Sequence, residues 1–473
     1  MKKFLLVLAL LALLAACGDG DATGDDPAAV IDPDAISGRV VLASESWNQE
    51  SDEELIRAFM EIYTNVTVTI EPFETDRMDF LSAQAAVMNL PCVIRSPWHE
   101  IPVDIAQGWL FPLNRFLETC PEIQYVERNL YDPWDFNGMV YSLPTNLGFT
   151  MFAVNLDMLD AMNEDIPGQE EFTIELFERL IRDATTTTTS GINSTWNIDQ
   201  FLPAQLDASL VDQLFNPTTG QFDLTGGAWI RGINMIRAWR DFPGLVSGYL
   251  WNQELRDEGL LDDYAIKFGE AGSAVGDGRV LVLRASTWDF WWLRNLPYRW
   301  DFFTYPFDPE VGYRTQVHAD QAVMLATTEY PEAAFALLRF LTYGRDGTLF
   351  RLQRYSAQDP PGFFIPSTNH PDVVDYFRSL DFVPDGVMFA YENLDRGVRG
   401  DHYRYVPGFL EVTGLIMGEE RERLWRGETD AASIAPDLER TMNEMLRQHA
   451  EDFRARLEVV QREFYELREE MGR

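Results

Sequence analysis

Apolar and polar residues recur with two different periods in the first part of the chain, which predicts strands and helices in turn. Residues 38–44 (GRVVLAS) and 66–73 (VTVTIEPF) have the patterns of strands, whereas residues 52–65 (DEELIRAFMEIYTN) carry apolar side chains at helical spacing. Residues 77–89 repeat the helical spacing, and residues 91–96 (PCVIRS) predict a further short strand. This alternation predicts an α/β layer with a mostly parallel sheet, in which ligands bind at the carboxyl ends of strands.

The pattern becomes mainly helical after residue 155 and later returns to strands. Residues 172–185 and 223–242 have apolar residues at helical spacing, while the polar, β-branched stretch 184–191 fits a loop. A strand pattern returns at 279–286 (RVLVLRAS), and residues 330–344 again predict a helix. The strand-rich pattern therefore occurs in two separate parts of the chain.

The two ends of the chain have patterns of their own. Residues 1–17 combine a basic start with an apolar run too short to span a bilayer, which predicts a secretory signal. They end in LAAC, which resembles a bacterial lipobox, so Cys17 would become a lipidated N-terminus; the alternative is an ordinary signal peptide with Cys17 incidental. Residues 18–37 predict a flexible linker. From Ser433 onward the chain is helical and strongly charged, compatible with a solvated helix, a partner-binding helix or a disordered end.

Length and composition narrow the class of protein. A chain of 473 residues favours two or three domains. Its formal net charge of -38 argues against nucleic-acid binding and against attachment to anionic lipid by charge. Cys92 and Cys120 could form a disulfide outside the cytoplasm or remain two buried thiols, and their spacing does not predict a metal site.

Motifs of catalysis are absent from the sequence. The five His residues have no metal-ligand spacing, no phosphate-binding glycine loop or GxSxG turn occurs, and nothing selects a catalytic pair among the 76 Asp and Glu. We therefore expect no enzyme activity, no cofactor and no metal. The tripeptide RGD at 399–401 resembles an adhesion motif, which we interpret as chance.

Tryptophans are concentrated in the stretch RASTWDFWWLRN, residues 284–295. Trp288, Trp291 and Trp292 have the spacing of one helix face, which is typical of a core anchor. The alternative is a ligand-binding wall of flat aromatic faces.

Several stretches, in their order along the chain, resemble the extracellular solute-binding proteins of ABC importers, the family 1 type typified by sugar binders. The early blocks are VVLASESW, LIRAFMEIYTN, VTVTIEPF and PCVIRS, the last with Cys92 in place of the usual Asp. NGMVYSLPTNLGFTMFAVNLDML is similar to the family's Gly-x-x-Tyr-x-Leu-Pro turn and the segment after it. FGEAGSAVGDGRVLVLRASTWDF is similar to a helix and a strand ending in Gly-x-Trp, here with Ser286 before Trp288. EYPEAAFALLRFLTYGRDGTLF and FFIPSTN match a late helix and turn, so the resemblance covers roughly residues 38–450.

This resemblance implies a two-lobed, periplasmic-binding-protein-like α/β fold (type II), with a mixed sheet and flanking helices in each lobe and a hinge between them. Carried over, the N-terminal lobe would be residues 38–150 plus 286–343, and the C-terminal lobe 151–285 plus 344–473. It further implies an extracytoplasmic receptor that closes around a solute and delivers it to an ABC permease. We expect a monomer, anchored to the cell membrane as a lipoprotein.

A carbohydrate is the expected ligand, because aromatic platforms and convergent polar groups complement the two faces of a sugar. The alternatives are a sensory or adhesive surface lipoprotein, or a binder of another polar solute such as a peptide or polyamine. The candidate ligand-binding residues are Trp47, Arg95, Trp98, Asn146, Trp196, Trp229, Trp288, Asp289 and Asp320. For Trp229, core packing is the competing interpretation, and for Arg95 an ion pair within its lobe. Trp291 and Trp292 are expected to lock Trp288 onto the core.

Overall fold

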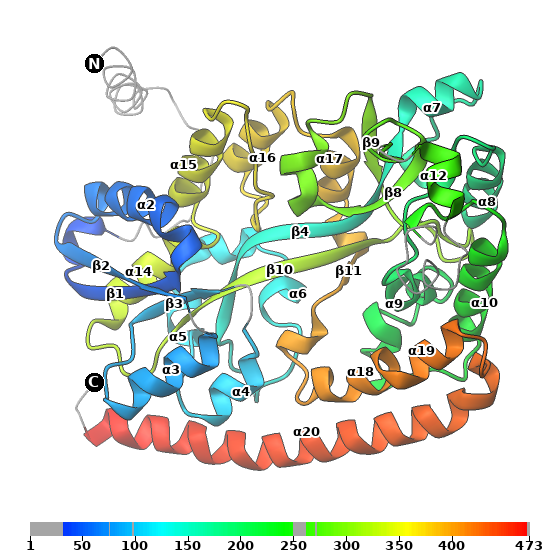
Figure 1. Ribbon diagram of the computed structural model, residues 1–473. Coiled ribbons are helices and arrows are strands. Elements are labelled where there is room, and N and C mark those ends of the chain that lie inside the picture. Colours follow the sequence, from blue (N-terminus) through cyan, green and yellow to red (C-terminus); the bar gives the residue numbers. More distant parts are fainter. Residues whose placement is uncertain (1–31, 75, 97–98, 249–261, 270–271, 471–473) are drawn as a thin grey trace.

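A mixed sheet of nine strands runs through the computed structural model, which describes residues 32–74, 76–96, 99–248, 262–269 and 272–470. Its main order is β2-β1-β3-β10-β4-β8-β5, with β11 paired to β10 and β9 paired to β4 (Figure 1). β6 and β7 form a separate two-stranded sheet. The strands are β1 (Gly38–Glu45), β2 (Val66–Phe73), β3 (Val93–Ser96), β4 (Ser142–Asn155), β5 (Ser190–Ile192), β6 (Phe215–Asn216), β7 (Gln221–Phe222), β8 (Val280–Ser286), β9 (Trp300–Phe303), β10 (Thr315–Met324) and β11 (Gly397–Arg399).

The expectation of a mostly parallel sheet is wrong for the middle of this sheet. β1 is parallel to β2 and β3, as strand–helix–strand units require. β10, however, is antiparallel to both β3 and β4, and β4 is antiparallel to β8. The two central strands come from distant parts of the chain and run against their neighbours, which the local hydrophobic pattern does not reveal.

The strands β4 and β10 belong to both parts of the molecule. Residues 321–324 of β10 pair with β3, and residues 316–323 pair with β4. Residues 150–154 of β4 then pair with β8. We call the part that contains β1–β3 the first lobe and the part that contains β5 and β8 the second lobe; β4 and β10 cross from one to the other (Figure 1).

Helices flank the sheet, and local sequence signals explain where several of them start. The Asp76 carboxylate accepts a hydrogen bond from the Met78 amide, and the Thr173 hydroxyl accepts one from the Leu176 amide, so both residues cap their helices. The helices up to the return of the strands are α2 (Gln49–Ile62), α3 (Arg77–Ala86), α4 (Ile101–Ala106), α5 (Asn114–Leu117), α6 (Arg128–Tyr131), α7 (Leu156–Ala161), α8 (Ile174–Asp183), α9 (Ile198–Phe201), α10 (Ala228–Asp241) and α12 (Asp262–Phe268). The later helices are α13 (Phe290–Leu293), α14 (Pro331–Leu341), α15 (Arg345–Ser356), α16 (Pro371–Arg378), α17 (Asp385–Glu392), α18 (Phe409–Met417), α19 (Glu419–Trp425) and α20 (Ala431–Glu470).

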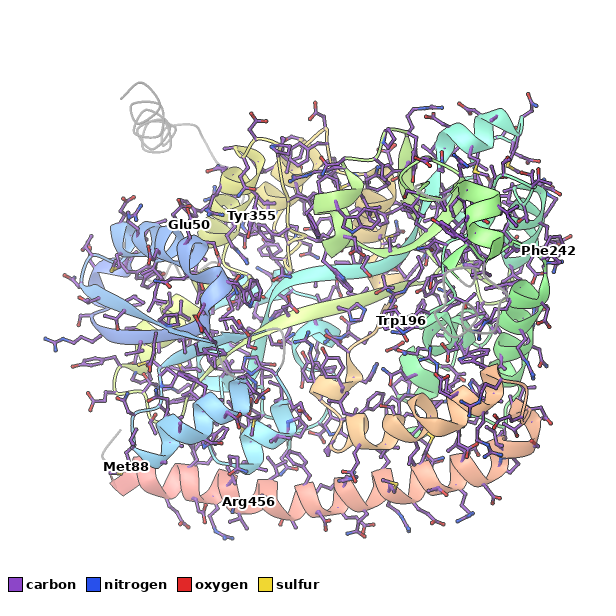
Figure 2. All side chains as sticks on the ribbon, in the orientation of Figure 1. Glu50, Met88, Trp196, Phe242, Tyr355 and Arg456 are labelled. Atoms are coloured by element: carbon purple, nitrogen blue, oxygen red, sulfur yellow. The ribbon has the colours of Figure 1, made fainter. Side chains whose placement is uncertain are left out.

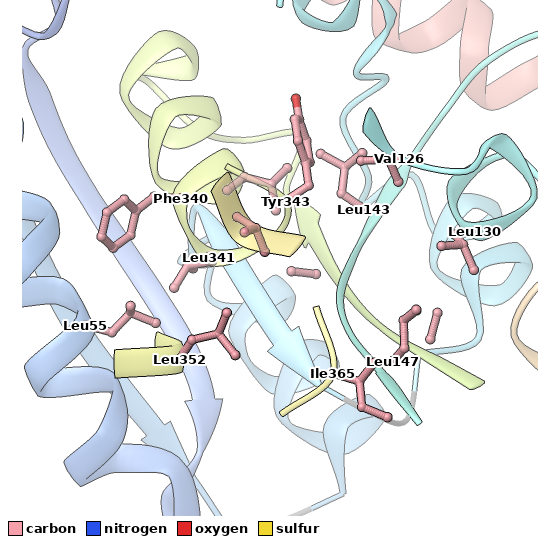
Figure 3. Close-up of a cluster of buried hydrophobic side chains, with 14 of the residues drawn as sticks. Leu55, Val126, Leu130, Leu143, Leu147, Phe340, Leu341, Tyr343, Leu352 and Ile365 are labelled. Carbon is pink, nitrogen blue, oxygen red and sulfur yellow. The ribbon is translucent and has the colours of Figure 1, made fainter. Parts of the chain in front are cut away.

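Buried apolar clusters lie in both lobes, and one of them extends from the first lobe to β8. In the first lobe, Leu55 of α2 and Phe340 of α14 lie in one cluster with Leu352 of α15 and Ile365 (Figure 3). In the second lobe, Trp239 of α10 packs with residues of α8, α9 and α18. α15 therefore lies with the elements of the first lobe, although the predicted division starts the return to the C-terminal lobe at residue 344.

The charged C-terminal segment forms a helix that packs against both lobes. Figure 1 shows α20 along one whole side of the molecule, from α19 to the region of α3 and α4. On the second lobe the Asn443 amide exchanges two hydrogen bonds with the backbone of Phe222. On the first lobe the Arg456 guanidinium donates to the Ala106 carbonyl, and the Gln461 amide donates to the Tyr141 hydroxyl. The segment is therefore a helix with one solvated face, which was the first of the three possibilities. The opposite face of the helix contacts both lobes.

Candidate functional site

Three strands lead directly to tryptophans that are exposed to solvent. Trp47 lies in the turn after β1 and is 72% exposed, and Trp288 lies in the turn after β8 and is 54% exposed. Trp196, a few residues after β5, is 62% exposed. Leaving apolar area in water costs roughly 25 cal/mol per Å². Exposed aromatics that follow strand ends in both lobes therefore mark a candidate binding surface.

The strand register places the ends of β3 and β8 beside the middle of β4 and β10. At the end of β3, Ser96 is opposite Gln321, one residue from Asp320. At the end of β8, Ser286 is opposite Thr150, which in turn is opposite Gln316. The carboxyl ends of strands from both lobes thus meet the same short stretch of the two crossing strands.

Asn146 and Asp320 are directly opposite each other in this stretch. The ladder between β4 and β10 is interrupted there, because Asn146 pairs with Asp320 while Pro144 pairs with Gln321, which leaves Thr145 as an extra residue. Such a bulge reorients neighbouring side chains. The Asn146 amide nitrogen donates a hydrogen bond of 3.1 Å to the Asp320 carboxylate. The sequence named both residues, and the fold brings them together.

Trp288 is held on the middle of the sheet by close packing. Its ring meets the ring of His318 edge-on at 5.4 Å, and the His318 imidazole is hydrogen-bonded to the Thr150 hydroxyl at 3.0 Å. A Cβ at Gly148 would lie 3.0 Å from the Trp288 ring, which is tighter than ordinary packing, so the missing side chain lets the indole lie close against β4. Burial lowers the pKa of His318 to about 4, so this supporting ring is neutral at pH 7.

Asp289 acts locally on the turn that carries Trp288. One carboxylate oxygen accepts the Ser286 amide at 2.9 Å, and the other accepts the Trp292 indole N–H at 3.2 Å. Trp292 packs against the buried cluster that extends from the first lobe to β8, as expected of a residue that locks the turn. Trp291, for which the same role was expected, is instead 66% exposed, because the short helix α13 presents its side chain to solvent.

Trp196 is supported by a cation from the adjacent strand. The guanidinium carbon of Arg284 in β8 lies 5.1 Å from the centre of the Trp196 ring. Figure 2 places Trp196 toward the middle of the molecule, on the inner side of the second lobe. The Arg284 backbone amide donates to the Asn193 side chain, which ties the loop after β5 to β8.

Arg95 forms an ion pair inside its own lobe. Its guanidinium lies 2.5 Å from the Asp52 carboxylate, and the Asp52 side chain is fully buried. Beside it, the Ser96 hydroxyl donates to the Glu45 carboxylate at 2.6 Å. Burial raises the pKa of Glu45. The polar groups at this end of the first lobe are thus largely engaged with one another.

The remaining candidate residues lie elsewhere. Trp229 is only 1% exposed and packs in the core of the second lobe on α10, which is the competing interpretation of that residue. Trp98 and Cys17 lie outside the described residues. Cys92 and Cys120 are both free, and the Tyr343 hydroxyl lies 3.3 Å from the Cys120 sulfur, so the two thiols do not pair in this structure.

The RGD tripeptide is buried at the centre of the molecule. Arg399 is 6% exposed and Asp401 is fully buried, and the two side chains pair with each other at 2.7 Å. An adhesion motif must be accessible, so this tripeptide has a structural role here. Arg404, a few residues later, donates to the Asp320 carboxylate at 3.0 Å.

Several of these contacts were not predicted from sequence, namely those of Glu45, Ser96, Arg284 and Arg404. The position of Glu45 and Ser96 at strand ends was an available signal. No signal in the sequence pointed to Arg404, because it lies 84 residues from Asp320 in the chain.

Two surface hollows of about 460 and 570 Å³ lie between α8 and α10, away from all of these residues. Arg182, Arg231 and Glu178 line both. Arg231 is already paired with Asp308 at 2.8 Å. We therefore locate the candidate site from the convergence of strand ends and exposed aromatics and not from these hollows.

The described residues offer neither a metal site nor a membrane span. No group of three or more His, Cys, Asp or Glu is arranged there to hold a metal ion. No helix within the described ranges has both the length and the apolar character needed to cross a bilayer.

Comparison with known proteins identifies the family. The model of the bacterial extracellular solute-binding protein family matches residues 45–342, more than half of the chain. The chain therefore belongs to this family. No curated protein sequence is significantly similar to it.

Solved structures share the fold at low sequence identity. An ABC substrate-binding protein from Listeria monocytogenes in complex with cycloalternan superposes with a TM-score of 0.64 at 15% identity, over 87% of this chain and 99% of that one. The sugar-binding protein MalE of Xanthomonas citri gives 0.66 at 13% identity, over 88% and 99%. The MalE domain of Bdellovibrio bacteriovorus bound to maltotriose gives 0.57 at 14%, over 87% and 100%. The predicted fold class, two α/β lobes with mixed strands and flanking helices, is confirmed.

Proposed function

We propose that this chain is the extracytoplasmic receptor of an ABC importer, which captures a carbohydrate between its lobes and delivers it to a membrane permease. The observations that support this most are the exposed Trp47, Trp196 and Trp288 after strands of both lobes, and the accessible hydrogen-bonded pair Asn146 and Asp320 on the crossing strands, where Trp288 packs against His318. A sugar offers an apolar C–H face for stacking and hydroxyls for hydrogen bonds, and this set of side chains supplies both kinds of contact.

Capture would proceed by hinge bending about β4 and β10. A few residues in each crossing strand can absorb the rotation while the lobes move as units. A ligand drives closure only through its greater affinity for the closed form, so contacts from both lobes are required. We propose the division 38–150 plus 286–343 and 151–285 plus 344–473, with two adjustments. α15 packs with the first lobe, and the turn after β8 that carries Trp288 is counted with the second lobe, to which β8 belongs.

The charged side chains near the site are already paired, which favours a neutral carbohydrate over charged solutes. Arg95 is paired with Asp52 and is not free to receive an anion. Several structurally similar proteins were solved with neutral sugars, including cycloalternan and maltotriose. We therefore propose a neutral oligosaccharide, stacked on Trp47, Trp196 and Trp288, with hydroxyls bound by Asn146 and Asp320. Trp98 stays a predicted contact.

A ligand screen tests this proposal directly. The purified protein would be assayed by thermal shift and calorimetry against neutral oligosaccharides such as maltotriose, with acidic sugars, peptides and polyamines as comparison groups. Mass spectrometry of solute released on denaturation would identify a ligand that co-purifies. Binding confined to neutral sugars supports the proposal, and binding confined to a peptide or polyamine contradicts it.

We also propose that Cys17 is lipidated and anchors the receptor to the cell membrane through the linker 18–37. Metabolic labelling with a palmitate analogue, followed by fractionation, tests the anchor. The label and the membrane association should both disappear in Cys17→Ser. Release of an unlabelled but otherwise processed wild-type protein would contradict it. A single mass in solution is expected for a receptor that works as a monomer.

A further inference from the structure

The buried segment around the RGD tripeptide reaches the candidate site from behind. It comprises β11 and the following turn, His402–Arg404. The Asp401 carboxylate accepts the backbone amide of Ala319 at 3.0 Å, and the Arg404 guanidinium donates to the first carboxylate oxygen of Asp320 at 3.0 Å. Two successive residues of β10 are therefore held from the same buried segment.

These contacts continue as a chain of hydrogen bonds with a defined direction. The second carboxylate oxygen of Asp320 accepts from the Asn146 amide nitrogen at 3.1 Å, and the Thr145 hydroxyl donates to the Asn146 amide oxygen at 2.8 Å. An arginine can only donate and an ionised carboxylate can only accept. With Asp320 as the acceptor, the NH₂ group of Asn146 must face it, so the amide orientation follows from the charges and not from an arbitrary assignment.

Arg404 is suited to fix the direction of these hydrogen bonds, because it is buried and always charged. Its side chain is 4% exposed, whereas that of Asp320 is 35% exposed, so a ligand can reach the carboxylate but not the guanidinium. Burial disfavours the charge on Arg404, yet Tyr403, Asp320 and Asp401 raise its pKa overall. It therefore remains a cation at any physiological pH.

We propose that Arg404 is a positioning residue that orients Asp320, and through it Asn146, so that the site selects neutral hydroxyl groups. This inference rests on the proposed solute-binding function. The residue touches no ligand itself and acts on the ligand through the Asp320 carboxylate. Its other ionic contact, with the Asp401 carboxylate at 3.1 Å, lies within the buried segment.

The selectivity follows from what remains available on the two oriented side chains. Each carboxylate oxygen of Asp320 has a lone pair beyond the one already used, and Asn146 has a second N–H. A ligand hydroxyl can donate to the Asp320 carboxylate and accept from the free N–H of Asn146. An anionic group would be repelled by the carboxylate, and an ammonium group would have no acceptor at the Asn146 N–H. Two adjacent hydroxyls of a sugar satisfy the pair best.

The fold should tolerate loss of the Arg404 charge. Asp401 loses its contact with Arg404, at 3.1 Å, but keeps its partners Arg399, at 2.7 Å, and the Ala319 amide. Residues 315–317 of β10 also remain paired with β11. The substitution Arg404→Met preserves the length and the apolar stem of the side chain. It removes the contacts with Asp320 and Asp401, while Arg399, the Ala319 amide and the strand pairing keep the segment anchored.

The test observes the Asn146 side chain without any ligand. In protein labelled with ¹⁵N-asparagine, the Asn146 NH₂ resonance, assigned by its loss in Asn146→Ser, reports the orientation and protection of the amide. In Arg404→Met we expect it to shift and its protons to exchange with solvent about tenfold faster, the equivalent of losing one hydrogen bond to a charged group. Arg404→Lys should restore part of the protection, because the ammonium group still donates.

A matched variant separates positioning from general destabilisation. Arg421→Met removes another buried arginine, which pairs with Asp199 at 2.7 Å in the second lobe and does not contact Asp320. It should lower the melting temperature but leave the Asn146 resonance unchanged. An unchanged resonance in folded Arg404→Met, or an equal change in Arg421→Met, would overturn the proposal.

Calorimetry with maltotriose as the probe then connects orientation to binding. If the wild-type protein binds maltotriose, Arg404→Met should weaken binding about tenfold or more and Arg404→Lys should recover part of it. Equal affinity in wild type and Arg404→Met would overturn the role in selectivity. If the wild-type protein binds no neutral sugar, the proposed carbohydrate function fails, and the amide measurement alone decides whether Arg404 orients the pair.

Discussion

The two lobes present different chemistry at the ends of their strands. At the end of the first lobe, charged and polar side chains pair with one another, as in Arg95–Asp52 and Ser96–Glu45. The second oxygens of the Glu45 and Asp52 carboxylates are buried without a hydrogen-bond partner. At the end of the second lobe, Trp196 and Trp288 face outward and leave more than half of their surface exposed. Trp47 is the exposed aromatic among the strand ends of the first lobe.

This difference suggests a division of roles between stability and affinity. A buried ion pair that loses one partner leaves an uncompensated charge, so polar groups of the first lobe should matter mainly to folding. An exposed tryptophan contributes little to the folded state and can contribute much to an interface. Four predictions, each with its own variants, would break or sharpen this comparison.

The largest effect is expected for Arg95→Met. Asp52 is fully buried, and without its partner the folded state should lose about 3 kcal/mol of stability, measured by urea unfolding. The double variant Arg95→Met, Asp52→Asn should recover most of the loss. If Arg95→Met instead weakened ligand binding with no change in stability, Arg95 would be a ligand contact and the comparison would fail.

Trp288→Ala should weaken ligand binding much more than it lowers stability. We expect ligand affinity to fall about 30-fold or more, the cost of a buried aromatic contact of about 2 kcal/mol, with a modest loss of stability. Trp292→Ala is the matched change, and it should chiefly lower the melting temperature because Trp292 packs on the core. Calorimetry and thermal unfolding of both variants check this, and the reverse outcome would contradict the division.

A smaller effect is expected where α20 joins the lobes. The double variant Arg456→Ala, Gln461→Ala removes hydrogen bonds to the first lobe, each worth about 1 kcal/mol, and should broaden the distribution of distances between the lobes. Single-molecule energy transfer between dyes at the exposed positions Glu50 and Asp241 measures this. Asn443→Ala, which contacts the second lobe nearer the other end of the helix, serves as the control. An unchanged distribution in the double variant would show that α20 does not restrain the hinge.

The smallest effect concerns Glu45. Burial raises its pKa above the usual 4.5, so the folded state holds this proton more tightly than the unfolded state. Stability therefore falls as the pH rises from 4.5 through the raised folded pKa. Glu45→Gln lacks this penalty, so its melting temperature relative to wild type should increase across that interval and then level off. A pH-independent difference would contradict the role of burial.

Much of the fold was predictable because its elements depend on short-range patterns. The predicted strand 66–73 coincides with β2, and the predicted helices at 77–89, 172–185 and 223–242 correspond to α3, α8 and α10. The family, and with it the two-lobed class, followed from the order of several motifs. The exposed state of Trp47, Trp196 and Trp288 agrees with their selection as candidates, whose role in binding stays a prediction.

The contacts of the site were less predictable because they connect distant residues. Arg95 and Asp52 lie 43 residues apart, and Asn146 and Asp320 lie 174 apart. Trp291 and Trp292 are adjacent in sequence, yet one is exposed and the other packs on the core. In a helix as short as α13, hydrophobic periodicity cannot tell which of two adjacent residues is buried. The elements packed against the helix decide which side chain they cover.

The sequence by itself determined the elements, the family and the presence of aromatic residues at strand ends, since each depends on residues that are near one another in the chain. Only the tertiary structure decided which polar groups remain available to a ligand. Arg95 is neutralised within its lobe, whereas Asp320 and Asn146 are oriented from behind by Arg404 and left accessible. The physical reason is that hydrogen bonds and ion pairs act over a few ångströms in space, and chain crossings bring their partners together.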